Sequence, residues 1–254
     1  MFALRCSAYL CKMFDNSERT EIGAMGEFGL IQHLSQHFEV KNSKTVKGIG
    51  DDCAVIDCGD HFGLLTTDLL LEGVHFDLSF HPLKHLGYKA ISVAISDVYA
   101  MNAMPTQITL SIGLSSRFSV EAIEEFYEGV YAACEEHGVD LIGGDTSSSQ
   151  KGFIISVTAI GEVVADKVVK RSTAQKGDLI CVSGDLGGAY LGLLFLEREK
   201  KIFIESPGVQ PDLENEAYVI GRLLKPKARK DIFEFLEEKD ILPTSMMDIS
   251  DGLS

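Results

Sequence analysis

One amphipathic stretch, residues 83–101, places the strongest constraint on how this chain can fold. Pro82 precedes the stretch, and apolar side chains recur on one face at helical spacing: Leu86, Ala90, Val93, Ala94, Val98 and Met101. Asp97 falls among these core-like residues. Because burying an ionised carboxylate without compensation costs several kcal/mol, the stretch predicts a core helix with a polar site beside it.

The rest of the chain alternates helical patterns with short apolar runs typical of strands. Ser119 is a favourable N-cap for a helix that Gly138 closes. We also expect helices at 26–38 and 187–198, strands at 53–57, 63–68, 107–114, 139–142, 153–164 and 179–183, and a charged surface loop at 200–211. The predicted fold class is mixed α/β (α+β). Because the strand pattern restarts near residues 165–175, we place a domain boundary there.

Charge and apolar patterning exclude several classes of function. The 254 residues carry 23 Lys and Arg against 38 Asp and Glu, a net charge of −15, so binding to nucleic acid or to an anionic membrane is not expected. The chain has neither a membrane-length apolar run nor a secretory signal pattern. Its six cysteines are scattered without metal-ligand spacing, which favours reduced thiols and a cytoplasmic location.

A subset of the aspartates differs from the solvated acidic residues. Each member ends or interrupts an apolar run beside Gly, Ser or Thr: Asp51, Asp52, Asp68, Asp97, Asp145, Asp248 and Asp251. Taken singly, each could cap a helix or a turn. Taken together, converging carboxylates repel one another by about 4 kcal/mol per pair at 4 Å and an effective dielectric near 20, so they require cations or raised pKa values. Oxygen ligands favour Mg²⁺ over zinc.

Phosphate binding is signalled less clearly. No P-loop and no protein-kinase motif is present in the sequence. Gly184, Gly187 and Gly188 could present backbone N–H groups to phosphate at a helix N-terminus, although a plain tight turn explains them equally well. Arg171 could bind phosphate oxygens or form an ion pair at the rim of a site.

The segments in their order resemble the thiamine-monophosphate kinase family, within the superfamily of aminoimidazole ribonucleotide synthetase and selenophosphate synthetase. The matching words are MGEFGLI, GIGDDCAVI, TTDLLLEGVHF, GYKAISVAISDVYAMNAMP, LIGGDTSSS, RSTAQKGDLICVSGDLGGAYLGL and MDISDGLS, which together span residues 25–254. Single words such as GGDT are weakly specific. The ordered set, and TTDLLLEGVHF above all, separates this family from its relatives.

The resemblance implies Mg²⁺-dependent transfer of the γ-phosphoryl group of ATP to thiamine monophosphate, giving thiamine diphosphate and ADP. The implied ligands of several magnesium ions are Asp51, Thr66, Thr67, Asp68, Asp97, Asp145, Asp248 and Asp251, with Asp68, Asp97 and Asp145 as the catalytic group. The implied nucleotide contacts are Tyr127, Gly144, Asp145, Arg171 and Ser250, and His75 is the implied thiamine contact. From the residue alone, His75 would equally be a structural histidine.

The resemblance also implies a domain plan and a homodimer. Residues 1–24 precede the first matching word and are expected to be an extension. Residues 25–165 would form a sheet-plus-helices domain that binds Mg-ATP and dimerises through its sheet, and 166–254 part of a C-terminal α/β domain. The family's later GGEDYE-like word and late aromatic are absent, so we expect a truncated C-terminal domain. Two other functions remain open: a non-catalytic, dimeric Mg-nucleotide-binding module, and another ATP-using enzyme of the superfamily.

Overall fold

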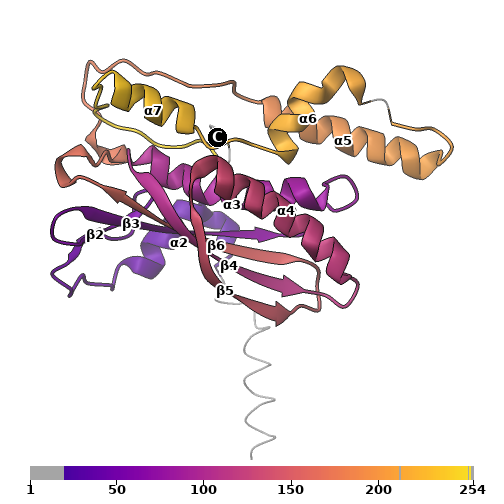
Figure 1. Ribbon diagram of the computed structural model, residues 1–254, viewed down its shortest axis with the longest axis horizontal. Coiled ribbons are helices and arrows are strands. Elements are labelled where there is room, and N and C mark those ends of the chain that lie inside the picture. Colours follow the sequence, from indigo (N-terminus) through magenta and orange to yellow (C-terminus); the bar gives the residue numbers. More distant parts are fainter. Residues whose placement is uncertain (1–19, 212, 251, 253–254) are drawn as a thin grey trace, which may run out of the picture. The chain divides into compact units, whose positions relative to one another are not determined.

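The computed structural model describes residues 20–211, 213–250 and 252 of the chain (Figure 1). The chain divides into two compact units after Lys41. The described part of the first unit contains a short 3₁₀ helix, η2 (Ile22–Ala24), and helix α2 (Gly26–Ser35). None of its described residues is buried. The helix predicted at 26–38 is therefore confirmed, with its end three residues earlier.

The second unit is built on a six-stranded sheet. The strands are β1 (Thr45–Lys47), β2 (Ala54–Asp57), β3 (Phe62–Leu71), β4 (Met104–Leu114), β5 (Asp140–Ser148) and β6 (Ile154–Val163). Their order across the sheet is β1-β2-β3-β6-β4-β5. All neighbours pair antiparallel except β4 and β5, which are parallel and joined through a helix. The mixed α and β fold class is thereby confirmed.

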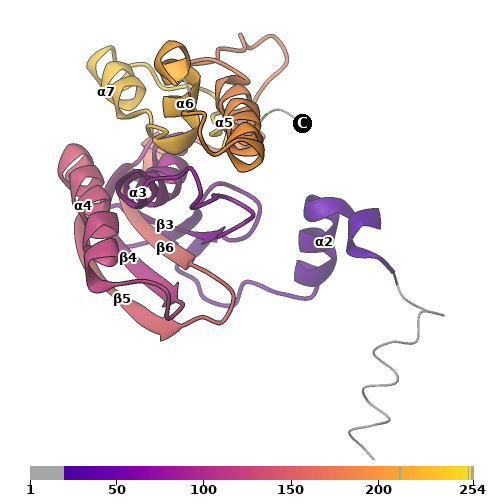
Figure 2. The same ribbon diagram turned by 90° about the vertical axis from the view of Figure 1, so that its right-hand side faces the viewer.

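Two long helices cover one face of this sheet (Figure 2). They are α3 (Leu83–Ala100) and α4 (Val120–His137), and the core lies between them and the sheet. Two glycines allow the helices to approach closely. A Cβ atom at Gly87 would lie 2.0 Å from the Phe126 carbonyl oxygen, and one at Gly129 would lie 1.8 Å from that of Lys84. Backbone therefore packs against backbone at this crossing.

The ends of α4 form as its sequence predicts. The Ser119 hydroxyl accepts a hydrogen bond from the Ala122 N–H, and Gly138 ends the helix in the left-handed conformation with φ of 70°. The predicted inner face of α3 is likewise confirmed: Leu86, Ala90, Ala94, Val98 and Met101 are fully buried and Val93 is half-buried. Helical periodicity was thus a reliable guide in this part of the chain.

The segment after β6 is helical and lies on the far side of α3 from the sheet (Figure 2). It contains the 3₁₀ helices η3 (Ala165–Lys167), η4 (Arg171–Thr173) and η5 (Glu214–Glu216), and the helices α5 (Gly188–Glu205), α6 (Ala217–Leu224) and α7 (Lys230–Glu238). A small apolar cluster of Leu196, Ile220 and Leu224 joins α5 to α6. Among the contacts that connect the segment to the core, His81 Nε2 lies 3.0 Å from the Leu224 carbonyl oxygen, and the Phe233 ring packs on Tyr99.

Two predictions for this segment are wrong. Residues 179–183 form no strand, and Leu179 and Ile180 are 91% and 95% exposed. A strand requires a hydrogen-bonding partner, and no described segment pairs with these residues. The predicted loop at 200–211 begins only after Glu205, because α5 continues through its charged residues until Ser206 and Pro207. Charge alone did not mark the end of this helix.

The division at residue 165 stays a prediction, as does the cytoplasmic location. Among the described residues, no helix combines the length and apolar character that crossing a membrane requires. The four described cysteines, Cys53, Cys58, Cys134 and Cys181, are free thiols.

Candidate active site

Three carboxylates from distant parts of the sequence meet in the second unit. One oxygen from each of Asp52, Asp97 and Asp248 lies within 4.8 Å of the others. Asp97 comes from the last turn of α3, three residues before its end, and Asp52 from the turn that precedes β2. Asp248 lies in an irregular segment after α7. We call these three residues the carboxylate cluster.

Met101, at the end of α3, connects two of the segments that form the cluster. Its Sδ atom accepts a hydrogen bond from the Cys53 N–H at 3.0 Å, and its carbonyl oxygen accepts one from the Val169 N–H at 3.2 Å. Met101 is fully buried. The turn that carries Asp52 and the loop that leads to Arg171 are therefore both attached to the helix that carries Asp97.

The electrostatics of the cluster are those of crowded, partly desolvated carboxylates. Burial raises the pKa of Asp97 to about 8, and the charges of Asp248, Asp68 and Asp52 add to the increase. Burial likewise raises the pKa of Asp52 to about 6, although Arg171 opposes the increase. A cation bound among these oxygens would favour the ionised forms, so the cluster has the electrostatic character of a cation site.

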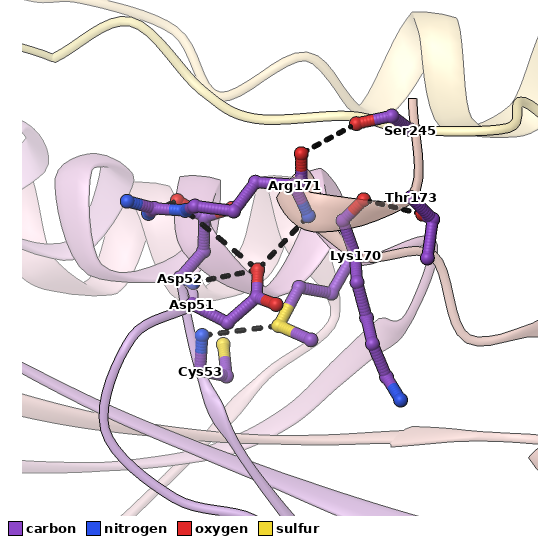
Figure 3. A network of polar contacts seen from close by, with 8 residues as sticks. Asp51, Asp52, Cys53, Lys170, Arg171, Thr173 and Ser245 are labelled. Carbon is purple, nitrogen blue, oxygen red and sulfur yellow. Dashed lines mark hydrogen bonds and ion pairs between the residues drawn. The ribbon is translucent and has the colours of Figure 1, made fainter. Parts of the chain in front are cut away.

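Arg171 lies against the Asp51–Asp52 turn (Figure 3). Its guanidinium forms an ion pair with Asp52, and its backbone N–H donates to Asp51 Oδ1 at 3.1 Å. The same Asp51 oxygen accepts the Asp52 N–H at 3.2 Å. The second oxygens of Asp51 and of Asp52 are buried and have no hydrogen-bond partner among the described residues. The ion pair that the sequence left open is thus formed, and two buried oxygens still have coordination capacity.

Strand β3 supplies predicted residues to both of its faces. Thr66 Oγ1 donates a 2.6 Å hydrogen bond to Asp97, and the charge of Asp68 raises the pKa of Asp97, so both residues lie beside the cluster. Because side chains alternate along a strand, Thr67 points to the other face, where it accepts a hydrogen bond from Thr158 at 3.2 Å. The structure therefore brings Thr66 and Asp68 to the cluster but not Thr67.

Asp145 lies apart from the cluster. Across the sheet, Asp68 pairs with Val157, Val157 with Leu110, and Leu110 with Gly144. Asp145 follows Gly144 on β5, so its backbone lies three strand spacings, about 14 Å, from that of Asp68 beside the cluster. A shallow depression brings Asp145 together with the predicted nucleotide contacts Gly144 and Tyr127. A Cβ atom at position 144 would meet the Leu110 carbonyl oxygen at 1.8 Å, so this strand contact requires glycine.

The remaining predicted residues lie elsewhere. His75 Nδ1 accepts the Leu71 N–H at 2.9 Å, which gives this histidine a structural bond in the turn after β3 and leaves Nε2 for another partner. Ser250 is exposed, two residues beyond Asp248. Asp251 lies outside the described residues. Arg171 and Ser250 are not among the residues that line the depression.

Asp52 is the member of the cluster that the sequence did not assign to metal binding. The sequence grouped Asp52 with the unusual aspartates but placed the ligand at Asp51. In the structure, Asp51 Oδ1 accepts two backbone N–H groups, whereas Asp52 contributes to the cluster. The sequence difference between them is adjacency to the strand: Asp52 directly precedes Cys53, and both Cys53 and Val55 of β2 are buried.

The sheet, its two covering helices and the aspartate site together match a known class of proteins. A family model described as AIR synthase related protein, N-terminal domain, matches residues 50–163, the stretch that runs from the Asp51–Asp52 turn through β6. The thiamine-monophosphate kinase of Aquifex aeolicus (strain VF5) is 39% identical over 229 residues, 90% of this chain and 68% of the relative. The thiamine-monophosphate kinase of Bacillus subtilis (strain 168) is 31% identical over 231 residues, 91% of this chain and 68% of the relative.

Solved structures give the same result. The structure of AaThiL complexed with AMPPCP and TMP is 36% identical with a TM-score of 0.73, over 87% of this chain and 66% of that chain. Thiamine monophosphate kinase from Aquifex aeolicus gives a TM-score of 0.70 at 33% identity, over 92% of this chain and 70% of that chain. This chain belongs to the thiamine-monophosphate kinase family. It spans about two thirds of the length of these relatives.

Proposed function

We propose that this protein transfers the γ-phosphoryl group of ATP to the phosphate of thiamine monophosphate, producing thiamine diphosphate and ADP in a Mg²⁺-dependent reaction. The observation that carries the proposal is the convergence of Asp52, Asp97 and Asp248 in a chain of this kinase family. A related structure holds AMPPCP and TMP, an ATP analogue and the expected acceptor. In the reaction, a phosphate oxygen of the acceptor bonds to the γ-phosphorus while the bond to the ADP oxygen breaks.

The chemistry of the cluster fits Mg²⁺. Two oxygens on opposite sides of a Mg²⁺ ion lie about 4 Å apart, and the carboxylate oxygens lie within 4.8 Å of one another. Asp52 Oδ2 is buried and has no hydrogen-bond donor in the part of the chain that the structure describes, which suits a metal ligand. When bound, Mg²⁺ would neutralise phosphate oxygens and align the two polyanionic substrates. The number of ions, and the inclusion of Asp51, Thr67, Asp145 and Asp251 among their ligands, stay predictions.

The chain's own residues would act mainly by positioning and electrostatics. The Thr66 hydroxyl fixes the orientation of the Asp97 carboxylate, and Arg171 adds positive charge beside Asp52. The depression with Tyr127, Gly144 and Asp145 is the proposed nucleotide side of the site. Phosphoryl transfer between phosphates requires little proton transfer, so the site needs no strong protein base.

We also propose that two copies of the chain associate through the face of the sheet opposite α3 and α4. Apolar side chains on this face are more than a third exposed: Ile56, Leu65, Leu69 and Ile154. Sedimentation-equilibrium measurements test this point. We expect a dimer for the unmodified chain and a monomer for Leu69→Lys, whose charge would be buried at the interface.

The activity is tested by incubating the 254-residue chain with thiamine monophosphate and Mg-ATP and detecting thiamine diphosphate by mass. Asp97→Asn and Asp145→Asn test the two sides of the site, and Asp166→Asn changes an exposed aspartate in η3 as a matched control. We expect product that EDTA abolishes, at least a 100-fold lower rate in Asp97→Asn, and an unchanged rate in the control.

Two other results would support the alternatives. If the chain binds a non-hydrolysable ATP analogue in the presence of Mg²⁺ but forms no product, it is a nucleotide-binding module. If ATP is consumed with a different phosphate acceptor and not with thiamine monophosphate, the chain is another ATP-using enzyme of the superfamily. Absence of both nucleotide binding and product contradicts the proposed function.

A further inference from the structure

Asp248 differs from the other members of the cluster because no helix or strand carries it. It lies in the irregular segment 239–250, ten residues beyond the end of α7. Asp97 is fixed by a buried helix and Asp52 by the start of a strand. A side chain on an irregular segment stays near two other carboxylates only if other bonds hold that segment.

Three hydrogen bonds hold this segment to the loop at 171–178. The Ser245 hydroxyl donates to the Arg171 carbonyl oxygen at 2.9 Å (Figure 3). The Thr244 hydroxyl donates to Asp178 Oδ2 at 2.6 Å, and the Thr244 carbonyl oxygen lies 2.5 Å from the Thr173 hydroxyl. The bond from Thr244 lowers the pKa of Asp178, as expected for a carboxylate that accepts it. All three bonds are made by Thr244 and Ser245, which lie four and three residues before Asp248.

The loop that receives these bonds is itself attached to the rest of the cluster. Arg171, whose carbonyl oxygen binds Ser245, donates its N–H to Asp51 and pairs with Asp52 through its guanidinium. Asp178 also accepts the Gln175 N–H at 2.8 Å, which fixes the turn that faces Thr244. A continuous set of bonds therefore runs from the Asp51–Asp52 turn through Arg171 to the segment of Asp248.

We propose that Ser245 and Thr244 are positioning residues that hold Asp248 in the carboxylate cluster and so set the affinity of the site for a divalent cation. The proposal rests on the proposed function for the existence of the metal site. Neither hydroxyl belongs to the cluster, so each acts through Asp248. Groups that orient a metal ligand typically change metal affinity by 10–100-fold when they are removed.

The test measures Mn²⁺ binding to the full chain by the electron paramagnetic resonance signal of free Mn²⁺. The test variant combines Thr244→Val with Ser245→Ala, which removes both hydroxyl donors. Thr244→Ser keeps a hydroxyl at the first position. Ser116→Ala, in the exposed turn between β4 and α4, removes a hydroxyl elsewhere as a control. We expect about 10-fold weaker Mn²⁺ binding in the double variant and a change below about 2-fold in the other two.

A second comparison separates positioning from a general effect on folding. The double variant is also made in the Asp248→Asn background, where the hydroxyls have no carboxylate to position. We expect Asp248→Asn to weaken Mn²⁺ binding and the added substitutions to cost less than about 2-fold more. Equal losses in both backgrounds, or no loss in the unmodified background, would overturn the proposal while leaving the metal site intact.

The metal site of the proposed function and the positioning role are tested by different variants. If Asp97→Asn and Asp248→Asn both leave Mn²⁺ binding unchanged, the carboxylate cluster is not the metal site, and the positioning role is overturned with it. If they weaken binding and the double variant does not, only the positioning role fails. Hydrogen exchange of the peptide 241–250 gives an independent readout, and we expect faster exchange in the double variant than in Thr244→Ser.

Discussion

The sheet with α3 and α4 and the segment after β6 contribute to one site in different ways. The first region places Asp52 and Asp97 by burial: the apolar faces of α3 and β3 fix the backbone, and the carboxylates follow. The second region places Asp248 by side-chain hydrogen bonds from an irregular segment. A buried scaffold tolerates few changes in its interior, whereas a hydrogen-bonded segment can lose its position without global unfolding.

The largest expected difference between the regions concerns two leucines. Leu64 on β3 is 1% exposed, and Leu179 is 91% exposed. Leu64→Ala is expected to lower the free energy of unfolding by about 2–5 kcal/mol, because it removes buried methyl groups and leaves a cavity. Leu179→Ala is expected to change it by less than about 0.5 kcal/mol. Urea unfolding followed by circular dichroism measures both changes. Similar losses of unfolding free energy in the two variants would contradict the difference between the two regions.

Two helical glycines sharpen the comparison. A Cβ atom at Gly129 would lie 1.8 Å from the Lys84 carbonyl oxygen, so Gly129→Ala must separate α3 from α4 at an expected cost of about 3 kcal/mol. Gly221 in α6 has open space around its Cα atom, so Gly221→Ala should stabilise by about 1 kcal/mol. Thermal unfolding distinguishes them. Two changes of the same sign would show that α6 is as tightly packed as α4.

A titration tests the bond between the two regions. Burial lowers the pKa of His81 to about 3, and its neutral ring donates from Nε2 to the Leu224 carbonyl oxygen. The folded pKa lies below the unfolded value of 6.5, so the unfolded chain binds more protons below pH 6.5, and stability falls as pH decreases from 6.5 toward 3. The expected loss is about 2 kcal/mol between pH 6.5 and 5.

His81→Gln serves as the control for this titration, because glutamine keeps a donor but does not titrate in this range. Its stability should be flatter than that of the unmodified chain between pH 6.5 and 5. Unfolding by urea at each pH gives both profiles. Parallel profiles would assign the pH dependence to other groups, His137 among them, since burial also lowers its pKa.

The smallest expected effect concerns the N-terminus of α4. Ser119→Ala removes the hydroxyl that accepts the Ala122 N–H and should cost about 1 kcal/mol. Ser119→Asp keeps an acceptor and should retain most of the stability. None of α5, α6 and α7 has a side-chain cap among the described residues, which distinguishes them from α4. Thermal unfolding measures the change, and equal losses in the two variants would contradict a capping role.

The same contrast explains what the sequence could predict. Periodicity located α3 and α4, because a helix that packs on a sheet must bury one face, and Ser119 and Gly138 marked the ends of α4. The pattern at 179–183 predicted a strand wrongly, because whether an apolar run becomes a strand depends on a partner elsewhere in the chain. Local sequence indicates which face a helix buries, but it does not indicate whether an apolar run finds a partner strand.

The residues of the site also fall into those that the sequence could predict and those that it could not. Asp97 was recognisable as unusual because it interrupts an apolar face, and Asp248 because it sits in DISDG. In the sequence, Asp51 and Asp52 differ in how near they are to the following strand, but the folded turn sets the direction of each side chain. Thr244 and Ser245 carried no signal, because a hydroxyl acquires a positioning role only from the groups that face it.

The order of the cluster along the chain has a consequence for how the protein is made. Asp52 and Asp248 are separated by about 200 residues. During synthesis, Asp52 and Asp97 emerge and can fold with the sheet long before Asp248 exists. Closing so long a loop costs entropy that local structure cannot supply, so the cluster forms only when the late segment docks on the finished core. Cation binding by the full cluster would therefore report that the segment of Asp248 has docked on the core.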